Sequence, residues 1–232
     1  MNDIQQIRQM LASCSKAERR EVFEHLRNEF GIHPLEQTLH ARAEVILEAI
    51  HRAGELTRRM IRGVIAGAAF DVEVADRLTG WSKLPLAGDP PYDCHLRDQS
   101  GEVKVQVKLQ RSKGGQPMRG GSAGKANSFA DSMYVVETQK TRAGTKKITS
   151  SSTRPYRFGE FDILAVAMYP STQRWDAFVY TVAAWLLPNP LDPSLIRKYQ
   201  PVSGLPNDDW TDDFATVVGW VRSGVTKTVR TQ

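Results

Sequence analysis

The stretch Tyr92–Arg111, YDCHLRDQSGEVKVQVKLQR, decides the fold prediction. Apolar residues occupy every second position from Val103 to Leu109, and a period of two is typical of a β-strand. The positions between them carry charged or amide side chains: Glu102, Lys104, Gln106, Lys108 and Gln110. We therefore expect a strand with one buried apolar face and one solvated polar face.

The segment RDQSG, residues 97–101, predicts the turn of a β-hairpin, with Asp98 as a side-chain cap and Gly101 at a positive φ angle. With this turn Arg97 lies opposite Glu102, and Asp93 lies opposite Gln106. Directly opposed Cβ atoms are about 5 Å apart, and Lys108 follows on the same face. An alternative register puts Asp93 opposite Glu102 with Lys104 as the lysine, but it leaves Gly101 outside the turn, so we favour the first.

An aspartate, a short hairpin and then acid-x-lysine form the active-site pattern of the PD-(D/E)XK nucleases, which this sequence resembles in PPYD and VQVK. Gln106 stands where the pattern expects an acid, a variant that the superfamily contains. A wider likeness runs from Gly88 to Thr181, through GDPPYDCHLRDQSGEVKVQVKLQRSKGGQP and RPYRFGEFDILAVAMYPSTQRWDAFVYT. In these segments the chain is similar to Type II restriction endonucleases.

The resemblance implies a restriction-endonuclease-like fold and Mg²⁺-dependent hydrolysis of double-stranded DNA. Asp93 and Gln106 would hold the metal ion, and Lys108 would orient the attacking water and stabilise charge. The family commonly takes a further acid from the helix before the hairpin. Here Asp71, Glu73 and Asp76 are available, and we choose Glu73. Glu160 and Asp162 are further acids at the start of a predicted strand, where we favour a structural hydrogen-bonding role.

The first eighty residues predict helices, and the chain changes to strands and loops from Trp81. A capping box of Ser15 and Glu18 starts one helix, a second runs from Pro34 to Gly54, and a third spans Leu56 to Leu78. The segments 161–169 and 174–182 predict strands, the first buried on both faces. We expect an α/β (α+β) fold: a helical region 1–55, for dimerisation or support, and a catalytic domain 56–232 with a central mixed sheet flanked by helices.

Charge is unevenly distributed along the chain. The formal net charge is +5, but residues 104–158 hold 12 basic and 2 acidic side chains, or +10, which leaves −5 for the rest. A segregated positive charge predicts a polyanion-binding face. We expect DNA contacts from the following residues: Gln110, Arg111, Lys113, Arg119, Lys125, Lys140, Arg142, Lys146, Lys147, Arg154 and Arg157.

The composition limits the classes of protein to which this chain can belong. Hydrophobic and charged contents of 41% and 25% are ordinary for a globular protein, and no apolar run reaches the length of a membrane span. Two isolated cysteines, without CxxC spacing, and a start without a signal pattern predict a cytoplasmic protein. We expect a homodimer on a palindromic target, and the resemblance implies a cognate DNA methyltransferase as a partner.

Two alternatives stay open from the sequence. One is another nuclease role on the same fold, such as a junction resolvase, a repair enzyme or a homing enzyme. The other is a sequence-specific DNA-binding protein whose active site has decayed, a hypothesis motivated by Gln106 and by Gly67 in the preceding helix.

Overall fold

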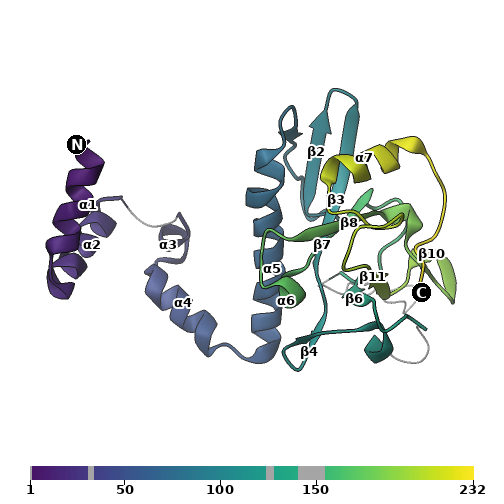
Figure 1. The fold of residues 1–232 in the computed structure, drawn as a ribbon, viewed down its shortest axis with the longest axis horizontal. Coiled ribbons are helices and arrows are strands. Elements are labelled where there is room, and N and C mark those ends of the chain that lie inside the picture. The colour runs from purple at the N-terminus through teal and green to yellow at the C-terminus, as the bar shows by residue number, and fades with distance from the viewer. Residues whose placement is uncertain (1, 31–33, 124–127, 141–154) are drawn as a thin grey trace. The chain divides into compact units, whose positions relative to one another are not determined.

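Figure 1 shows the computed structural model of the chain, which describes residues 2–30, 34–123, 128–140 and 155–232. The chain divides into two compact units, Met1–Arg59 and Met60–Gln232. The division into regions 1–55 and 56–232 stays a prediction, because compactness alone does not show that either part folds by itself.

In the first unit all regular elements of the described residues are helices: α1 (Asp3–Ser13), α2 (Lys16–Phe30), α3 (Pro34–Leu39), α4 (Ala43–Arg52) and the start of α5 (Glu55–Glu73). The predicted capping box is confirmed. The Ser15 amide donates to Glu18 Oε2 at 2.7 Å, and the Glu18 amide donates to Ser15 Oγ at 3.3 Å. These bonds satisfy two backbone donors that the first turn of α2 leaves without helical partners.

The prediction of one continuous helix from Pro34 to Gly54 is wrong, because the chain breaks between α3 and α4. His40 adopts a left-handed conformation with φ +48°. The Glu36 carboxylate then accepts a hydrogen bond from the Ala43 amide at 2.6 Å and caps the first turn of α4. The apolar spacing of three and four residues continues across the break, so periodicity alone did not reveal it.

The second unit is built on a five-stranded sheet in the order β1-β2-β3-β7-β8. Its strands are β1 (Ser82–Lys83), β2 (Cys94–Asp98), β3 (Gly101–Leu109), β7 (Ile163–Ala167) and β8 (Phe178–Val182). The β3–β7 pair is parallel, and the other neighbours are antiparallel. This mixed sheet with helices confirms the predicted α/β (α+β) class, and β7 is buried at all of its positions, as expected.

The predicted hairpin register is confirmed. Arg97 pairs with Glu102, Asp98 pairs with Gly101, and Cys94 pairs with Val105. Asp98 Oδ1 accepts a hydrogen bond from the Ser100 amide at 2.8 Å, and Gly101 has φ +135°.

One face of the sheet is covered by α5 and by the C-terminal helix α7 (Phe214–Ser223), which lie beside it in Figure 1. Phe70 of α5 and Phe214 of α7 meet edge to face over this sheet, with ring centroids 6.0 Å apart. The apolar side chains of β2 and β3, including Leu96 and Val105, belong to the same core.

A second core covers the other face, so the expectation of a solvated polar face is wrong. This core includes Tyr156, Phe161 and Trp210 together with residues of β6 (Tyr134–Glu137) and β11 (Tyr199–Val202). Gln106 and Gln110 are consequently 2% and 1% exposed. The remaining short strands and helix are β4 (Ser112–Lys113), β5 (Gln116–Pro117), β9 (Pro188–Asn189), β10 (Asp192–Ile196) and α6 (Tyr169–Thr172).

We expect Gly101→Ala to lower the free energy of unfolding by about 1–3 kcal/mol, because residues with a side chain rarely adopt this positive φ angle. Chemical denaturation measures the change. Gly219→Ala is the matched control: Gly219 lies in α7 with open space at its Cβ position, so the same change should stabilise the protein by about 0.5–1 kcal/mol. Equal stability of the two variants would contradict the role given to the turn.

Candidate active site

The hairpin brings Asp93 and Gln106 into direct contact. Gln106 Nε2 donates to Asp93 Oδ2 and also donates to the Val107 carbonyl oxygen at 3.1 Å. The Val107 amide donates to the same Asp93 Oδ2 at 2.8 Å. The Asp93 backbone amide donates to the Val105 carbonyl at 2.9 Å, which extends the hairpin pairing as far as Asp93. The predicted pair therefore comes together at the open end of the hairpin.

Lys108 lies on the same strand face, within the electrostatic field of Asp93, and contacts a residue far along the chain. Its Nζ donates to the Tyr156 hydroxyl oxygen at 3.0 Å. The sequence did not predict this contact, because no spacing rule relates two side chains 48 positions apart. Two carboxylates, Asp93 and Glu137, also act electrostatically on the Lys108 ammonium.

Desolvation dominates the electrostatics of this pair. Asp93 is exposed as a residue, but its carboxyl group lies mostly against protein, and this desolvation raises its pKa. The Lys108 ammonium and the Val107 amide oppose that rise, whereas the Asp71 charge adds to it. Desolvation likewise lowers the pKa of Lys108, against the opposing pull of Asp93 and Glu137. Both groups are therefore held in a low-dielectric setting, which is common at functional sites.

The helix before the hairpin places Asp71, rather than Glu73, in the electrostatic field of Asp93. Glu73 forms an ion pair with Arg77 one turn further along the chain. Asp71 forms an ion pair with Lys83, at 3.1 Å, and Lys83 also pairs with Asp76 at 2.8 Å. The choice of Glu73 as a catalytic acid therefore stays a prediction without a contact that supports it, and Asp71 is the better candidate.

The two acids before β7 have structural partners. Asp162 Oδ2 accepts a hydrogen bond from the Lys104 amide at 2.8 Å, in line with the structural role favoured from the sequence. Glu160 accepts from the Arg157 amide at 2.9 Å and forms an ion pair with Lys140 at 2.7 Å.

The predicted DNA-binding residues fall into groups. Gln110 is buried, and its Oε1 accepts from the Ser171 amide at 3.0 Å, so it faces protein and we leave it out of the proposed DNA surface. Arg111 and Lys140 form ion pairs with Glu137 and Glu160. Three exposed residues form no ion pair with the described part of the chain: Lys113, Arg119 and Arg157. Five others lie outside the described residues: Lys125, Arg142, Lys146, Lys147 and Arg154.

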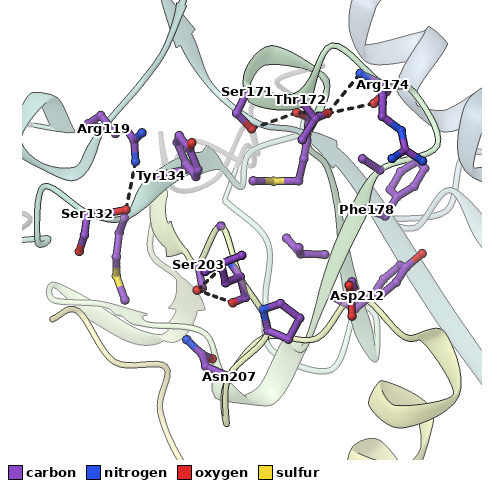
Figure 2. A pocket seen from close by; sticks show the side chains of 18 of the residues that line it. Arg119, Ser132, Tyr134, Ser171, Thr172, Arg174, Phe178, Ser203, Asn207 and Asp212 are labelled. Carbon is purple, nitrogen blue, oxygen red and sulfur yellow. Dashed lines mark hydrogen bonds between the residues drawn. The ribbon is translucent and has the colours of Figure 1, made fainter.

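A hollow of about 860 Å³ is lined by residues of β8 and α6 and by the segment 203–207, among them Phe178, Ser171 and Asn207 (Figure 2). Arg119 stands at its edge, where the guanidinium group stacks 4.0 Å above the Tyr134 ring and donates to the Ser132 carbonyl at 3.1 Å. Gly204 lies against the same ring, and an added Cβ there would come within 2.8 Å of it. Arg119 is thus held in a fixed position with further donors available to a ligand.

Asp93 and Gln106 are suitable ligands for a Mg²⁺ ion that keeps most of its water ligands. Among the described residues, no three histidine, cysteine, aspartate or glutamate side chains gather closely enough to form a metal site. Mg²⁺, however, commonly binds through one or two carboxylates together with waters and substrate phosphates. Asp93 supplies a carboxylate, and Gln106 Oε1 has no hydrogen bond within the described structure and is a neutral oxygen donor beside it.

No protein-family model and no curated protein matches this chain. Among solved structures, the chain is similar to a bacterial homing endonuclease, I-Ssp6803I, with 20% sequence identity and a TM-score of 0.38. The match covers 74% of this chain and 96% of that one. At this TM-score the similarity carries no argument about activity. No helix in the described residues is long and apolar enough to cross a membrane.

We expect Gln106→Glu to lower the free energy of unfolding in metal-free buffer by about 1–3 kcal/mol, because the change removes two donated hydrogen bonds and places a second carboxylate beside Asp93. Added Mg²⁺ or Mn²⁺ should restore stability, since a ligand that binds the folded state stabilises it. Chemical denaturation with and without metal measures both effects.

Gln200→Glu is the matched control for this experiment. Gln200 is equally buried and donates to the Leu187 and Arg197 carbonyls, but it belongs to β11 and has no contact with Asp93. We expect the same loss of stability without rescue by metal. Equal rescue of both variants, or of neither, would contradict a metal site at the hairpin.

Proposed function

We propose that the protein is a Mg²⁺-dependent endonuclease that hydrolyses phosphodiester bonds of double-stranded DNA at a specific short sequence. The observation that carries the proposal is the joint position of Asp93, Gln106 and Lys108 on one face of the β2–β3 hairpin. The register of the hairpin is the one that the PD-(D/E)XK pattern requires, and the desolvation of Asp93 and Lys108 is in keeping with a functional site.

Each residue has a definite task in this chemistry. Phosphodiester hydrolysis needs a positioned water, stabilisation of the charge that develops on the phosphoryl oxygens, and protonation of the leaving oxygen. A bound Mg²⁺ would supply Lewis-acid stabilisation and lower the pKa of its waters. Asp93 and the Gln106 carbonyl oxygen would hold the ion against the scissile phosphate. Lys108, which lies on the same strand face, would orient the attacking water and stabilise the phosphoryl charge.

The proposed activity also implies an oligomeric state, a partner enzyme and a location in the cell. A palindromic duplex target mirrors the two-fold symmetry of a homodimer, and the helical unit Met1–Arg59 is the candidate dimer surface. A Type II restriction role calls for a DNA methyltransferase that protects the host sequence, and for a cytoplasmic enzyme. The two cysteines are free thiols, as a reducing compartment allows.

A second candidate function is DNA binding without cleavage. Gln106 donates a hydrogen bond to the Asp93 carboxylate, so this carboxylate has a partner without any metal ion. In a decayed nuclease the hairpin would keep this contact and only the DNA-binding surface would matter.

Incubation of the purified protein with a long duplex of known sequence tests the proposal. With Mg²⁺ we expect discrete fragments from the wild type and none with EDTA. Asp93→Ala and Lys108→Ala should slow cleavage by about a hundred-fold or more, because each removes a group that acts on the developing charge. Asp176→Ala, at an exposed ion pair with Arg174, is the control that should cleave normally.

The outcomes separate the candidate functions. An intact duplex, with Mg²⁺ and with Mn²⁺, that is nevertheless shifted on a gel would favour the binding protein and overturn the catalytic assignment. Cleavage of branched or damaged duplexes irrespective of sequence would favour a resolvase or repair role, and a long asymmetric target would favour a homing enzyme.

Arg119 should bind a DNA phosphate, because its guanidinium group is exposed, fixed on Tyr134 and without an ion pair to the described residues. Each phosphate contact adds roughly 0.9 to the slope of log affinity against log salt. We therefore expect Arg119→Gln to flatten this slope by about 0.9, measured by fluorescence anisotropy on the cognate duplex. Arg20→Gln, which breaks an exposed pair with Glu24 on α2, should leave the slope unchanged. Identical slopes for wild type and Arg119→Gln would remove Arg119 from the DNA surface.

A further inference from the structure

Tyr156 is fixed in place more firmly than the lysine that it contacts. It is 4% exposed, and its ring packs edge to face on Phe161 with centroids 5.3 Å apart and an interplanar angle of 86°. Phe161 is itself 2% exposed. The hydroxyl oxygen of Tyr156 therefore has a defined position at the end of a rigid side chain with two rotatable bonds.

The Lys108 ammonium, by contrast, ends a flexible four-carbon chain and carries three donors. The groups that act on it are the carboxylates of Asp93 and Glu137 and the hydroxyl of Tyr156. Lys108 Nζ lies 5.1 Å from the centroid of the Tyr156 ring and 3.0 Å from the hydroxyl oxygen. Among the described residues, the hydroxyl of Tyr156 is the group that accepts a hydrogen bond from the ammonium.

We infer that Tyr156 is a positioning residue for Lys108: its hydroxyl accepts a hydrogen bond from Nζ and holds the ammonium within the electrostatic field of Asp93, in the geometry that catalysis needs. This inference rests on the proposed nuclease function for its catalytic meaning. The hydrogen bond itself does not depend on that function. A lysine without this contact would reach Asp93 or Glu137 in several conformations, and misplacement of a catalytic group by about 1 Å can cost roughly a hundred-fold in rate.

Tyr156→Phe removes the hydroxyl and keeps the ring, so the packing on Phe161 is retained. Tyr180→Phe is the matched control, because Tyr180 is also buried, at 3% exposure, and stacks on Phe178 away from Lys108. We expect Tyr156→Phe to lower kcat for DNA cleavage by about ten- to hundred-fold with KM within about two-fold of the wild type, whereas Tyr180→Phe changes neither. Both variants are compared for Tm, and cleavage is measured well below it.

A second readout does not need cleavage. A hydrogen-bonded lysine ammonium exchanges its protons slowly enough for its ¹H–¹⁵N signal to be observed by NMR, and Lys108→Arg assigns that signal by removing it. We expect the Lys108 signal in the wild type and in Tyr180→Phe, and its loss in Tyr156→Phe. An unchanged signal in Tyr156→Phe overturns the inference, as does an unchanged kcat in an active enzyme.

The two readouts separate failure of the inference from failure of the proposed function. A wild type that cleaves no DNA but loses the ammonium signal on Tyr156→Phe shows that the positioning contact exists and that the nuclease function fails. A wild type that cleaves DNA, with Tyr156→Phe equal to it in kcat, shows that the nuclease function holds and that Tyr156 does not position Lys108 for catalysis.

Discussion

The register of the β2–β3 hairpin is the constraint on which the rest of this structure depends. Side chains alternate between faces with a period of two, so a slip of one residue would move Gln106 and Lys108 to the opposite face and separate them from Asp93. The turn prevents that slip through the Asp98 cap, the positive φ of Gly101 and the Arg97–Glu102 pair. Arg222 of α7 also donates two hydrogen bonds to Asp98, at 2.6 and 2.9 Å, and ties the turn to the helix layer.

Strand β3 carries polar side chains, Gln106 and Lys108, at covered positions where a sheet normally has apolar ones. Because helices cover one face and a second core covers the other, Gln106 and Lys108 lie inside the protein and must find partners there. Gln106 bonds to Asp93, and Lys108 bonds to Tyr156. Apolar side chains at these positions would cost less in desolvation, and this cost supports the proposed catalytic role of Gln106 and Lys108.

Local patterns made much of this predictable. The turn chemistry of residues 97–101 sufficed for the register, and that register correctly paired Asp93 with Gln106; the apolar run of β7 predicted a central strand, and Ser15 with Glu18 predicted a helix start. The failures came from contacts between distant residues. Tyr156 contacts Lys108 across 48 positions, and residues from other parts of the chain bury Gln110. The helix break at His40 was missed for a different reason, because the apolar stripe continues across it and the Glu36 carboxylate caps the next helix. Helical spacing alone also could not show that Asp71 acts electrostatically on Asp93, whereas Glu73 forms an ion pair with Arg77.

Binding of Mn²⁺ in the presence of a non-hydrolysable duplex, followed by electron paramagnetic resonance, tests the central claim most directly. The account predicts that wild type and DNA together bind Mn²⁺ and that Asp93→Asn weakens this binding by about ten-fold or more, because the substitution removes the carboxylate of the site. Asp176→Asn, the same change at an exposed ion pair, should bind Mn²⁺ as the wild type does. Equal affinity for Mn²⁺ in the wild type and in Asp93→Asn would contradict the claim that the β2–β3 hairpin forms the catalytic centre.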